Sequence, residues 1–316
     1  MKNKVLIIKI GALGDVLRTT PILRVLKADV TWVTGKDALP LLKGNPYITN
    51  LLSVHEFGWN GLNDPKPNKR AQIVLETHYD LVLSLEEDYF AAKLASLAIK
   101  KNCVGAYLSQ GKVLYTPSAK GWFDMSLISC YGKRAADKIK QKNKKSYQEI
   151  LFGMLNLKFN GEEYVLPAMQ TKTSKPRPKK SLVVGLEMRS GSRWAAKRWP
   201  HFSKFCSLLR RDKVTFFPFR QMPSLNGYVR LIGKADIVVT TDSLALHIAL
   251  ALQKKIVALF TCTSPDELYG YDRMKKIVSP LLNKYYYTTK KTQSPGKAIK
   301  VEMVLDAFNR WKLNDK

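Results

Sequence analysis

The stretch IKIGALGDVLRTTPIL, residues 8–23, decides how this chain is interpreted. The apolar run KVLIIKI (4–10) that leads into it predicts a parallel strand covered on both faces. Gly11 and Gly14 then allow a tight turn and a close approach of the backbone to a ligand. Asp15 follows where a helix should begin. Two roles stay open for it: an N-cap, or a catalytic base that faces a second substrate.

The start of this first helix also has two candidates. Thr20 followed by Pro21 forms a good pair of N-cap and first-turn residues. The helix therefore begins either at Asp15, with a bend further on, or only at Thr20.

The alternation of strand and helix repeats along the chain. A basic, proline-containing break, MQTKTSKPRPKK (169–180), predicts a linker between domains at 1–168 and 181–316. Two such units predict an α/β protein of two facing, doubly wound domains with a cleft between them. The last helix (301–312) packs either in the C-terminal domain or back on the N-terminal one. Further strands are expected at 29–35, 79–85, 102–108, 181–188, 213–219, 235–241 and 255–261, and helices at 89–101, 200–211 and 243–252 and within 121–157.

Length and composition fit this organisation. The chain has 316 residues, 45% of them hydrophobic, which suffices for two domains of ordinary size. No apolar run reaches the roughly 18 residues that a bilayer crossing needs. Lys9 interrupts the apolar N-terminal run early, so this run is interpreted as a strand rather than a signal peptide. The four cysteines have no metal or redox spacing, and reduced thiols in a cytoplasmic protein are the simplest interpretation.

The net charge of the chain is unusual. Lys and Arg total 53 against 25 Asp and Glu, a formal charge of +28, and both halves of the chain are basic. Such a charge favours anionic partners, which include nucleic acid, a phospholipid surface and phosphorylated substrates. A basic proteome with solvated lysines remains an alternative explanation.

A second junction, EMRSGSRWAAKRWPHF (187–202), follows the first strand of the C-terminal domain. Its hydroxyls, its cations and the start of a helix together form a plausible diphosphate site. A solvated basic loop whose tryptophans pack on the domain is the alternative. The candidates at this junction are Ser192, Arg193 and Lys197.

A third junction, VVTTDSLALHIALAL (238–252), places Asp242 and Ser243 at a strand end, where ligands of α/β sheets bind. His247 lies about one helical turn after Ser243 and can face the same ligand. The alternative has Asp242 or Ser243 as a helix cap and His247 as a hydrogen-bonded histidine of the core.

Taken together, four passages resemble glycosyltransferase family 9, the ADP-heptose:lipopolysaccharide heptosyltransferases. They are LIIKIGALGDVLRTTPIL (6–23), YDLVLSLEEDYFAAKLASLAIKKNCVGAY (79–107), KRWP (197–200) with the serines before it, and DSLALHIALALQKKIVALFTCTSPDELYGY (242–271). The resemblance implies a GT-B fold of two Rossmann-like domains, in which the N-terminal domain binds the acceptor and the C-terminal domain binds the sugar nucleotide.

The resemblance also implies a reaction and a role for each candidate residue. The expected reaction is inverting glycosyl transfer without a metal or another cofactor. Asp15 matches the general base, and Lys197 matches the lysine that neutralises the donor phosphates. Ser192 or Arg193 is expected to contact the same phosphates, and Asp242, Ser243 and His247 are expected at the donor sugar and diphosphate. The residues expected on the acceptor side are Gly11, Gly14, Arg18, Glu86 and Glu87.

The sequence departs from the family pattern at several points. Leu244 stands where the family usually has glycine beside the donor sugar, and FTCTSP (260–265) replaces a phenylalanine–glycine–proline passage. The acidic cluster Glu86, Glu87 and Asp88 either contacts an acceptor amine or polyol, or pairs with nearby lysines. A glycine pair is missing at VTFFPFRQMP (214–223), which leaves the nucleotide base open.

The expected partners are a sugar nucleotide donor, a phosphorylated glycolipid or glycan acceptor, and the anionic inner face of a bacterial cytoplasmic membrane. No nucleic-acid partner is expected, because the chain has no RNA-recognition motif and no zinc-finger spacing. Two alternatives remain: a non-catalytic α/β protein that binds nucleic acid, and a degenerate family member that binds a sugar nucleotide without transferring it.

Overall fold

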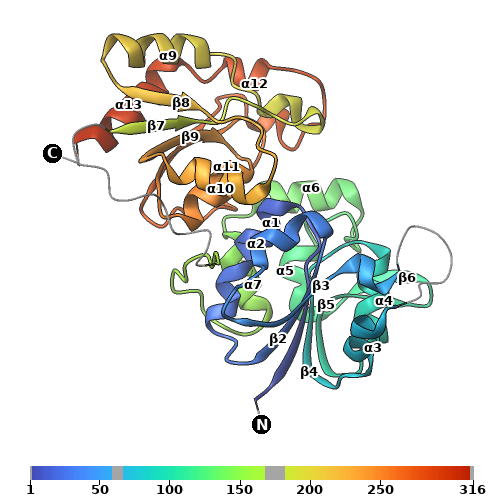
Figure 1. Cartoon of the computed structure of the whole chain (residues 1–316). Helices are drawn as coiled ribbons and strands as arrows, with labels where there is room; N and C mark the ends of the chain where they lie inside the picture. The colour runs from blue at the N-terminus through green and yellow to red at the C-terminus, as the bar shows by residue number, and fades with distance from the viewer. Residues whose placement is uncertain (1, 59–66, 168–181, 314–316) are drawn as a thin grey trace. The chain divides into compact units, whose positions relative to one another are not determined.

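The structure, a computed structural model, describes residues 2–58, 67–167 and 182–313, without the side chains of residues 192, 193 and 313 (Figure 1). The chain divides into two compact units, Met1–Pro167 and Ala168–Lys316. The linker expected at 169–180 lies outside the described residues.

The N-terminal unit contains a six-stranded sheet in the order β3-β2-β1-β4-β5-β6. The first five strands of this order run parallel, and β6 pairs antiparallel with β5 at the edge. Strand order reverses beside β1, which makes the unit doubly wound. The strands are β1 (Lys4–Ile8), β2 (Asp29–Thr34), β3 (Ile48–Ser53), β4 (Tyr79–Ser84), β5 (Lys100–Ser109) and β6 (Lys112–Tyr115).

Helices cover both faces of this sheet. Val5 and Ile7 of β1 pack in one hydrophobic cluster and Leu6 and Ile8 in the other, as the period of two along a strand requires. Because both faces are buried, β1 is apolar throughout. The helices are α1 (Leu13–Thr19), α2 (Leu39–Leu42), α3 (Lys69–Glu76), α4 (Tyr89–Leu97), α5 (Lys120–Phe123), α6 (Lys133–Lys142) and α7 (Tyr147–Met154).

The first helix begins at neither of the two expected positions. Ala12 has the extended backbone of an N-cap, with φ −67° and ψ 169°, and α1 starts at Leu13. Asp15 is therefore the third residue of the helix, and its expected N-cap role is wrong. At Thr20 the helix tightens into a 3-10 turn, Thr20–Arg24, with Pro21 in its first turn.

The C-terminal unit contains a parallel sheet in the order β11-β10-β9-β7-β8. Helices α10 and α11 lie on one side of it, and α9 and α13 on the other (Figure 1). The strands are β7 (Val183–Leu186), β8 (Thr215–Pro218), β9 (Ile237–Thr241), β10 (Lys255–Phe260) and β11 (Met274–Val278). The helices are α9 (Phe202–Arg211), α10 (Leu225–Gly233), α11 (Leu244–Ala251), α12 (Ser294–Lys297) and α13 (Val301–Leu313).

The last helix belongs to the core of the C-terminal unit. Val304, Phe308 and Trp311 of α13 are buried in one hydrophobic cluster with Phe205 of α9. Trp311 Nε1 also donates a hydrogen bond to the main-chain oxygen of Ile256 in β10, at 3.1 Å. This apolar face anchors the helix on its own sheet.

Two doubly wound α/β units confirm the fold class that the sequence predicts. Within the described part of the chain, none of the helices combines the length and the hydropathy that a membrane crossing requires.

Candidate functional site

The loop that leads from β1 to α1 is held by one carboxylate. Glu86 Oε1 accepts hydrogen bonds from Lys9 Nζ at 2.8 Å, from the Ile10 N–H at 2.7 Å and from the Gly11 N–H at 3.0 Å. Parallel pairing of β1 with β4 brings the two strand ends together. Glu86 follows β4 and therefore fixes the backbone that positions Asp15.

Lys9 is almost completely buried and depends on this carboxylate for a counter-charge. Burial disfavours its charged form, but the Glu86 carboxylate, with smaller contributions from Tyr147 and Asp15, keeps the pKa of Lys9 above its ordinary value. Lys9 is therefore charged at neutral pH. Of the two alternatives for Glu86, the structure shows pairing with a lysine.

The other two residues of the acidic cluster also have local partners. Glu87 Oε2 accepts a hydrogen bond from the Leu127 N–H at 3.0 Å. Asp88 is the N-cap of α4, where its Oδ1 accepts from the Phe90 and Ala91 N–H groups. Glu87 and Asp88 thus stabilise the loops beside the carboxyl end of β4.

Asp15 lies in the first turn of α1 with 36% of its side chain exposed. Its Oδ1 lies 3.0 Å from Nε of Arg18, one helical turn further on. The Arg18 guanidinium in turn lies over the ring of Tyr147, 4.1 Å from the ring centroid, and near Trp122 at 5.5 Å. The expected acceptor-side residues Asp15 and Arg18 are therefore in contact, and Arg18 is fixed by two aromatic rings.

The expected glycines of this loop differ in their surroundings. A Cβ added at Gly11 would meet no atom within 4 Å. Gly14 lies inside α1, directly before Asp15. Open space beside Gly11 means that the fold itself does not require a glycine there.

In the C-terminal unit, the second and third junctions meet at one ion pair. Lys197 Nζ lies 2.8 Å from Asp242 Oδ2 and donates a second hydrogen bond to the main-chain oxygen of Asp242 at 2.9 Å. The two side chains are 16% and 20% exposed, respectively. Lys197 ends a short 3-10 segment, Ser192–Lys197, and Asp242 directly follows β9.

The electrostatics of this pair favour the ionised carboxylate. Burial opposes ionisation of Asp242, but the Lys197 ammonium and then His247 outweigh it and hold the pKa of Asp242 well below its ordinary value. Lys197 and His247 thus both interact electrostatically with the Asp242 carboxylate, which directly follows β9 at the carboxyl end of the C-terminal sheet.

Ser243 and His247 lie at the start of α11. Ser243 is the N-cap residue, but its hydroxyl contacts Thr240 Oγ1 at 3.0 Å and makes no capping hydrogen bond. His247, one turn further on, is buried. The first turn of this eight-residue helix thus lacks a side-chain cap, which suits an anion at its N-terminus.

The remaining two candidates, Ser192 and Arg193, begin the 3-10 segment that ends at Lys197. The structure does not describe the side chains of these two residues. Trp194 in the same segment was not among the candidates. The Lys197 ammonium lies 5.2 Å from the centroid of the Trp194 ring, and this ring makes an edge contact with Tyr287.

One polar cluster of the C-terminal unit was missed by reasoning from sequence. Glu187, directly after β7, is buried and accepts two hydrogen bonds from the Arg189 guanidinium, each at 2.9 Å. Tyr228 of α10 donates a short hydrogen bond to the same carboxylate. Burial and the Glu187 charge raise the pKa of Tyr228. An acidic residue directly after a parallel strand was the signal that could have indicated this cluster.

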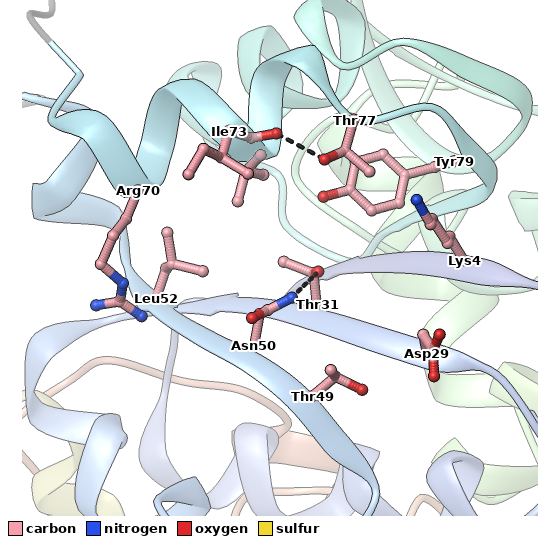
Figure 2. A pocket seen from close by; sticks show the side chains of 11 residues that line it. Lys4, Asp29, Thr31, Thr49, Asn50, Leu52, Arg70, Ile73, Thr77 and Tyr79 are labelled. Carbon is pink, nitrogen blue, oxygen red and sulfur yellow. Dashed lines mark hydrogen bonds between the residues drawn. The ribbon is translucent and has the colours of Figure 1, made fainter.

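A cavity of about 230 Å³ lies elsewhere in the N-terminal unit, beside α3 (Figure 2). It adjoins Lys4 and Asp29, the first residues of β1 and β2, and so lies at the amino end of the sheet. Its polar groups bond to their neighbours: Asn50 Nδ2 donates to Thr31 Oγ1, and Arg70 pairs with Glu56. The candidate residues of this unit lie at the opposite, carboxyl end of its sheet.

No group of three or more His, Cys, Asp or Glu side chains in the described residues has an arrangement that could hold a metal ion.

Comparisons with known proteins bear on the family and on the fold. The model of Glycosyltransferase family 9 (heptosyltransferase) matches residues 222–299, the segment that contains Asp242, Ser243 and His247. No curated protein sequence matches the chain.

Among solved structures, a glycosyl transferase family 9 protein from Veillonella parvula is similar with a TM-score of 0.69 at 17% identity, over 99% of this chain and 98% of that one. E. coli heptosyltransferase WaaC with ADP-2-deoxy-2-fluoro heptose is similar with a TM-score of 0.62 at 16% identity, over 97% of this chain and 99% of that one. E. coli ADP-heptose lps heptosyltransferase II is similar with a TM-score of 0.60 at 18% identity, over 99% of each chain. At these identities the likeness establishes the fold.

Fold and family match together define the class of this protein, a glycosyltransferase with the GT-B fold. The resemblance to glycosyltransferase family 9, the heptosyltransferase family, is confirmed, with the direct sequence match over residues 222–299.

Proposed function

We propose that the chain transfers a sugar from a nucleoside diphosphate donor, with inversion and without a metal, to a hydroxyl group of a glycolipid or glycan acceptor. The observation that carries this proposal is the Lys197–Asp242 ion pair at the carboxyl end of the C-terminal sheet, in which Lys197 Nζ lies 2.8 Å from Asp242 Oδ2. The start of α11 lies directly beside it. A cation and a helix N-terminus together suit a diphosphate.

On the donor side, the leaving diphosphate gains negative charge as the glycosidic bond breaks. Lys197, held by Asp242, stabilises this charge from a fixed position, which costs little reorganisation at the moment of reaction. The uncapped first turn of α11 offers main-chain N–H groups to the same phosphates. His247, in the field of Asp242, is the third polar group for the donor.

These groups give a reason to expect transfer without a metal. The Lys197 ammonium and a helix N-terminus supply the positive charge that Mg²⁺ supplies in other transferases. The test is transfer after exhaustive chelation. Full activity in EDTA, unchanged by added Mg²⁺ or iron, supports the proposal, and activity that returns only with an added metal contradicts it.

On the acceptor side, Asp15 is the proposed general base, and it accepts the proton of the attacking hydroxyl group. A sugar hydroxyl is a weak nucleophile, so a positioned carboxylate is worth about 10²–10⁴-fold in rate. Arg18 orients this carboxylate, and Trp122 and Tyr147 fix Arg18. Open space beside Gly11 leaves room for the acceptor.

The proposed donor is ADP-heptose. This choice rests on the family description that matches residues 222–299 and on two solved structures of one similar protein, E. coli heptosyltransferase WaaC, which contain ADP and an ADP-heptose analogue. Leu244, half-buried at the first position of α11, is the residue expected to alter which sugar fits. The proposed acceptor is a phosphorylated, lipopolysaccharide-core-like glycan at the inner face of the cytoplasmic membrane, as the basic composition suggests.

The experiment that tests the reaction compares wild type with Asp15→Asn. This change keeps the size of the side chain and one acceptor oxygen for Arg18, but removes its charge and its basicity. We expect transfer from ADP-heptose to a truncated core acceptor to fall at least about 100-fold, with donor binding and the thermal midpoint retained. Undiminished transfer by the folded variant would contradict the role of Asp15.

A further inference from the structure

Helix α6 (Lys133–Lys142) contributes little to the core of the N-terminal unit. Of its ten residues only Ala136 is buried, whereas six residues of the next helix, α7, are buried. Lys140 lies over the ring of Trp122, at 5.9 Å from the centroid, and marks the side that faces the unit. Apart from Ala135 and Lys140, which are half-buried, the other residues of α6 are exposed.

This exposed surface is strongly basic. Residues 127–145 contain seven Lys and Arg and a single acidic residue, Asp137. Asp137 pairs with Lys133 at 2.8 Å, and both side chains of this pair are more than half exposed. Like charges at this density repel one another, and a bound anionic surface would relieve that repulsion.

Large apolar side chains accompany the charges. Leu127 is 75% exposed and Tyr131 is 57% exposed, in the loop directly before α6, and Ile139 of α6 is 37% exposed. A single exposed leucine needs no explanation, but two such side chains next to a basic helix form a recognisable combination. Lysines around apolar and aromatic side chains are typical of segments that lie in a membrane interface.

We propose that residues 127–145, termed here the basic–apolar segment, bind the headgroup region of an anionic phospholipid surface. Leu127 and Tyr131 enter the boundary between headgroups and acyl chains, and the lysines of α6 contact the phosphates. The segment lies on the unit that carries Asp15, and Leu127 bonds through its N–H to Glu87 beside β4. The inference does not depend on the proposed reaction, because binding to a lipid surface is measured without a substrate.

The apolar side chains distinguish a lipid surface from nucleic acid. Phosphate contacts alone would satisfy the lysines in either complex. Leu127, however, has neither a ring to stack on a base nor a polar group to read one, and it gains free energy only in an apolar medium.

The experiment measures co-sedimentation of the full chain with vesicles of equal parts phosphatidylglycerol and phosphatidylcholine, and with phosphatidylcholine alone. We expect binding to the anionic vesicles only. It should weaken strongly between about 0.1 M and 1 M NaCl, as the Debye length falls from about 10 Å to about 3 Å.

Two variants locate the binding surface. Lys138→Ala/Lys142→Ala/Lys145→Ala should weaken binding on the order of 100-fold, at about fivefold per lysine. Leu127→Ser should weaken binding to the anionic vesicles about tenfold. The ratio of wild-type to variant binding should be the same at low and at high salt, because the lost contact is apolar. Both change exposed side chains, so the thermal midpoint should remain close to that of wild type.

The matched control is Lys43→Ala/Lys101→Ala/Lys112→Ala, which removes the same charge from exposed positions of the same unit outside the segment. This variant should bind nearly as well as wild type. Equal loss in both triple variants would mean that net charge alone acts, and would overturn the proposal. The proposal also fails if the chain does not bind the anionic vesicles. It fails as well if the chain binds RNA instead and Leu127→Ser does not change that binding.

Discussion

Lys197 Nζ and Asp242 Oδ2 lie 2.8 Å apart, and the same ammonium group donates to the main-chain oxygen of Asp242. This double contact joins the strand end of β9 to the segment that follows β7. Because β7 and β9 are parallel neighbours, residues 45 positions apart meet at one edge of the sheet. The pair therefore has a structural role, which unfolding experiments measure, and a proposed role in donor binding, which nucleotide-binding experiments measure.

The structural role of the pair predicts a pH-dependent stability. The depressed pKa of folded Asp242 means that its ionisation contributes stability above its unfolded value of 3.8, and that this contribution is lost as the pH falls toward the lower folded pKa. In Asp242→Asn the Lys197 charge loses its partner, which should cost about 3 kcal/mol at neutral pH. Urea unfolding at several pH values should show this difference shrink below about pH 4.

A suitable control is Asp137→Asn, because the Asp137–Lys133 pair is exposed. Its loss should change the free energy of unfolding by less than about 1 kcal/mol. A stability difference for Asp242→Asn that stays constant down to about pH 3 would contradict the pKa argument.

Glu86→Gln should destabilise the N-terminal unit by about 3 kcal/mol, because it leaves the buried Lys9 ammonium without a counter-charge. Chemical denaturation measures this loss. The double variant Lys9→Met/Glu86→Gln should recover a large part of it, since neither residue of the pair is then charged. Glu76→Gln, a change of the same kind at the exposed end of α3, should be close to neutral. Additive losses in the double variant would argue against coupling between Lys9 and Glu86.

Gly11→Ala should leave the thermal midpoint nearly unchanged, since the added methyl group meets no atom within 4 Å. If the acceptor approaches this loop, the same methyl group should lower kcat/KM by about tenfold to 100-fold through misplacement of the acceptor hydroxyl. Gly153→Ala adds a methyl group at an exposed position of α7 and should leave transfer unaffected. Full activity of Gly11→Ala would place the acceptor elsewhere.

The central strands could be predicted from the sequence because each is a continuous apolar run that helices cover on both faces. Strand β3 (Ile48–Ser53) could not, since its first half is partly exposed and shows no alternation. The antiparallel edge strand β6 is only four residues long and is likewise partly exposed. Edge strands have weak patterns because one side of their backbone has no neighbour.

The candidate site could be predicted in part, for a physical reason. Polar residues at or shortly after the ends of parallel strands identify Glu86 and Asp242, and Asp15 lies in the helix that follows β1, because strand ends meet at one edge of a sheet. Their partners depend on three-dimensional contacts between distant residues. The bond from Lys9 to Glu86 spans 77 positions, and Tyr228 reaches Glu187 across 41. The N-cap at Ala12 could not be foreseen either, since an alanine carries no capping group.

The most direct test of the central claim is calorimetric binding of ADP, UDP, GDP, CDP and their common sugar conjugates in metal-free buffer. We expect one diphosphate to bind to wild type and Lys197→Ala to weaken this binding by about tenfold to 100-fold. Lys204→Ala, which removes an exposed lysine paired with Glu302 in the same unit, should bind like wild type. A folded wild-type protein that binds none of these nucleotides, or a Lys197→Ala variant that binds equally well, would contradict the account.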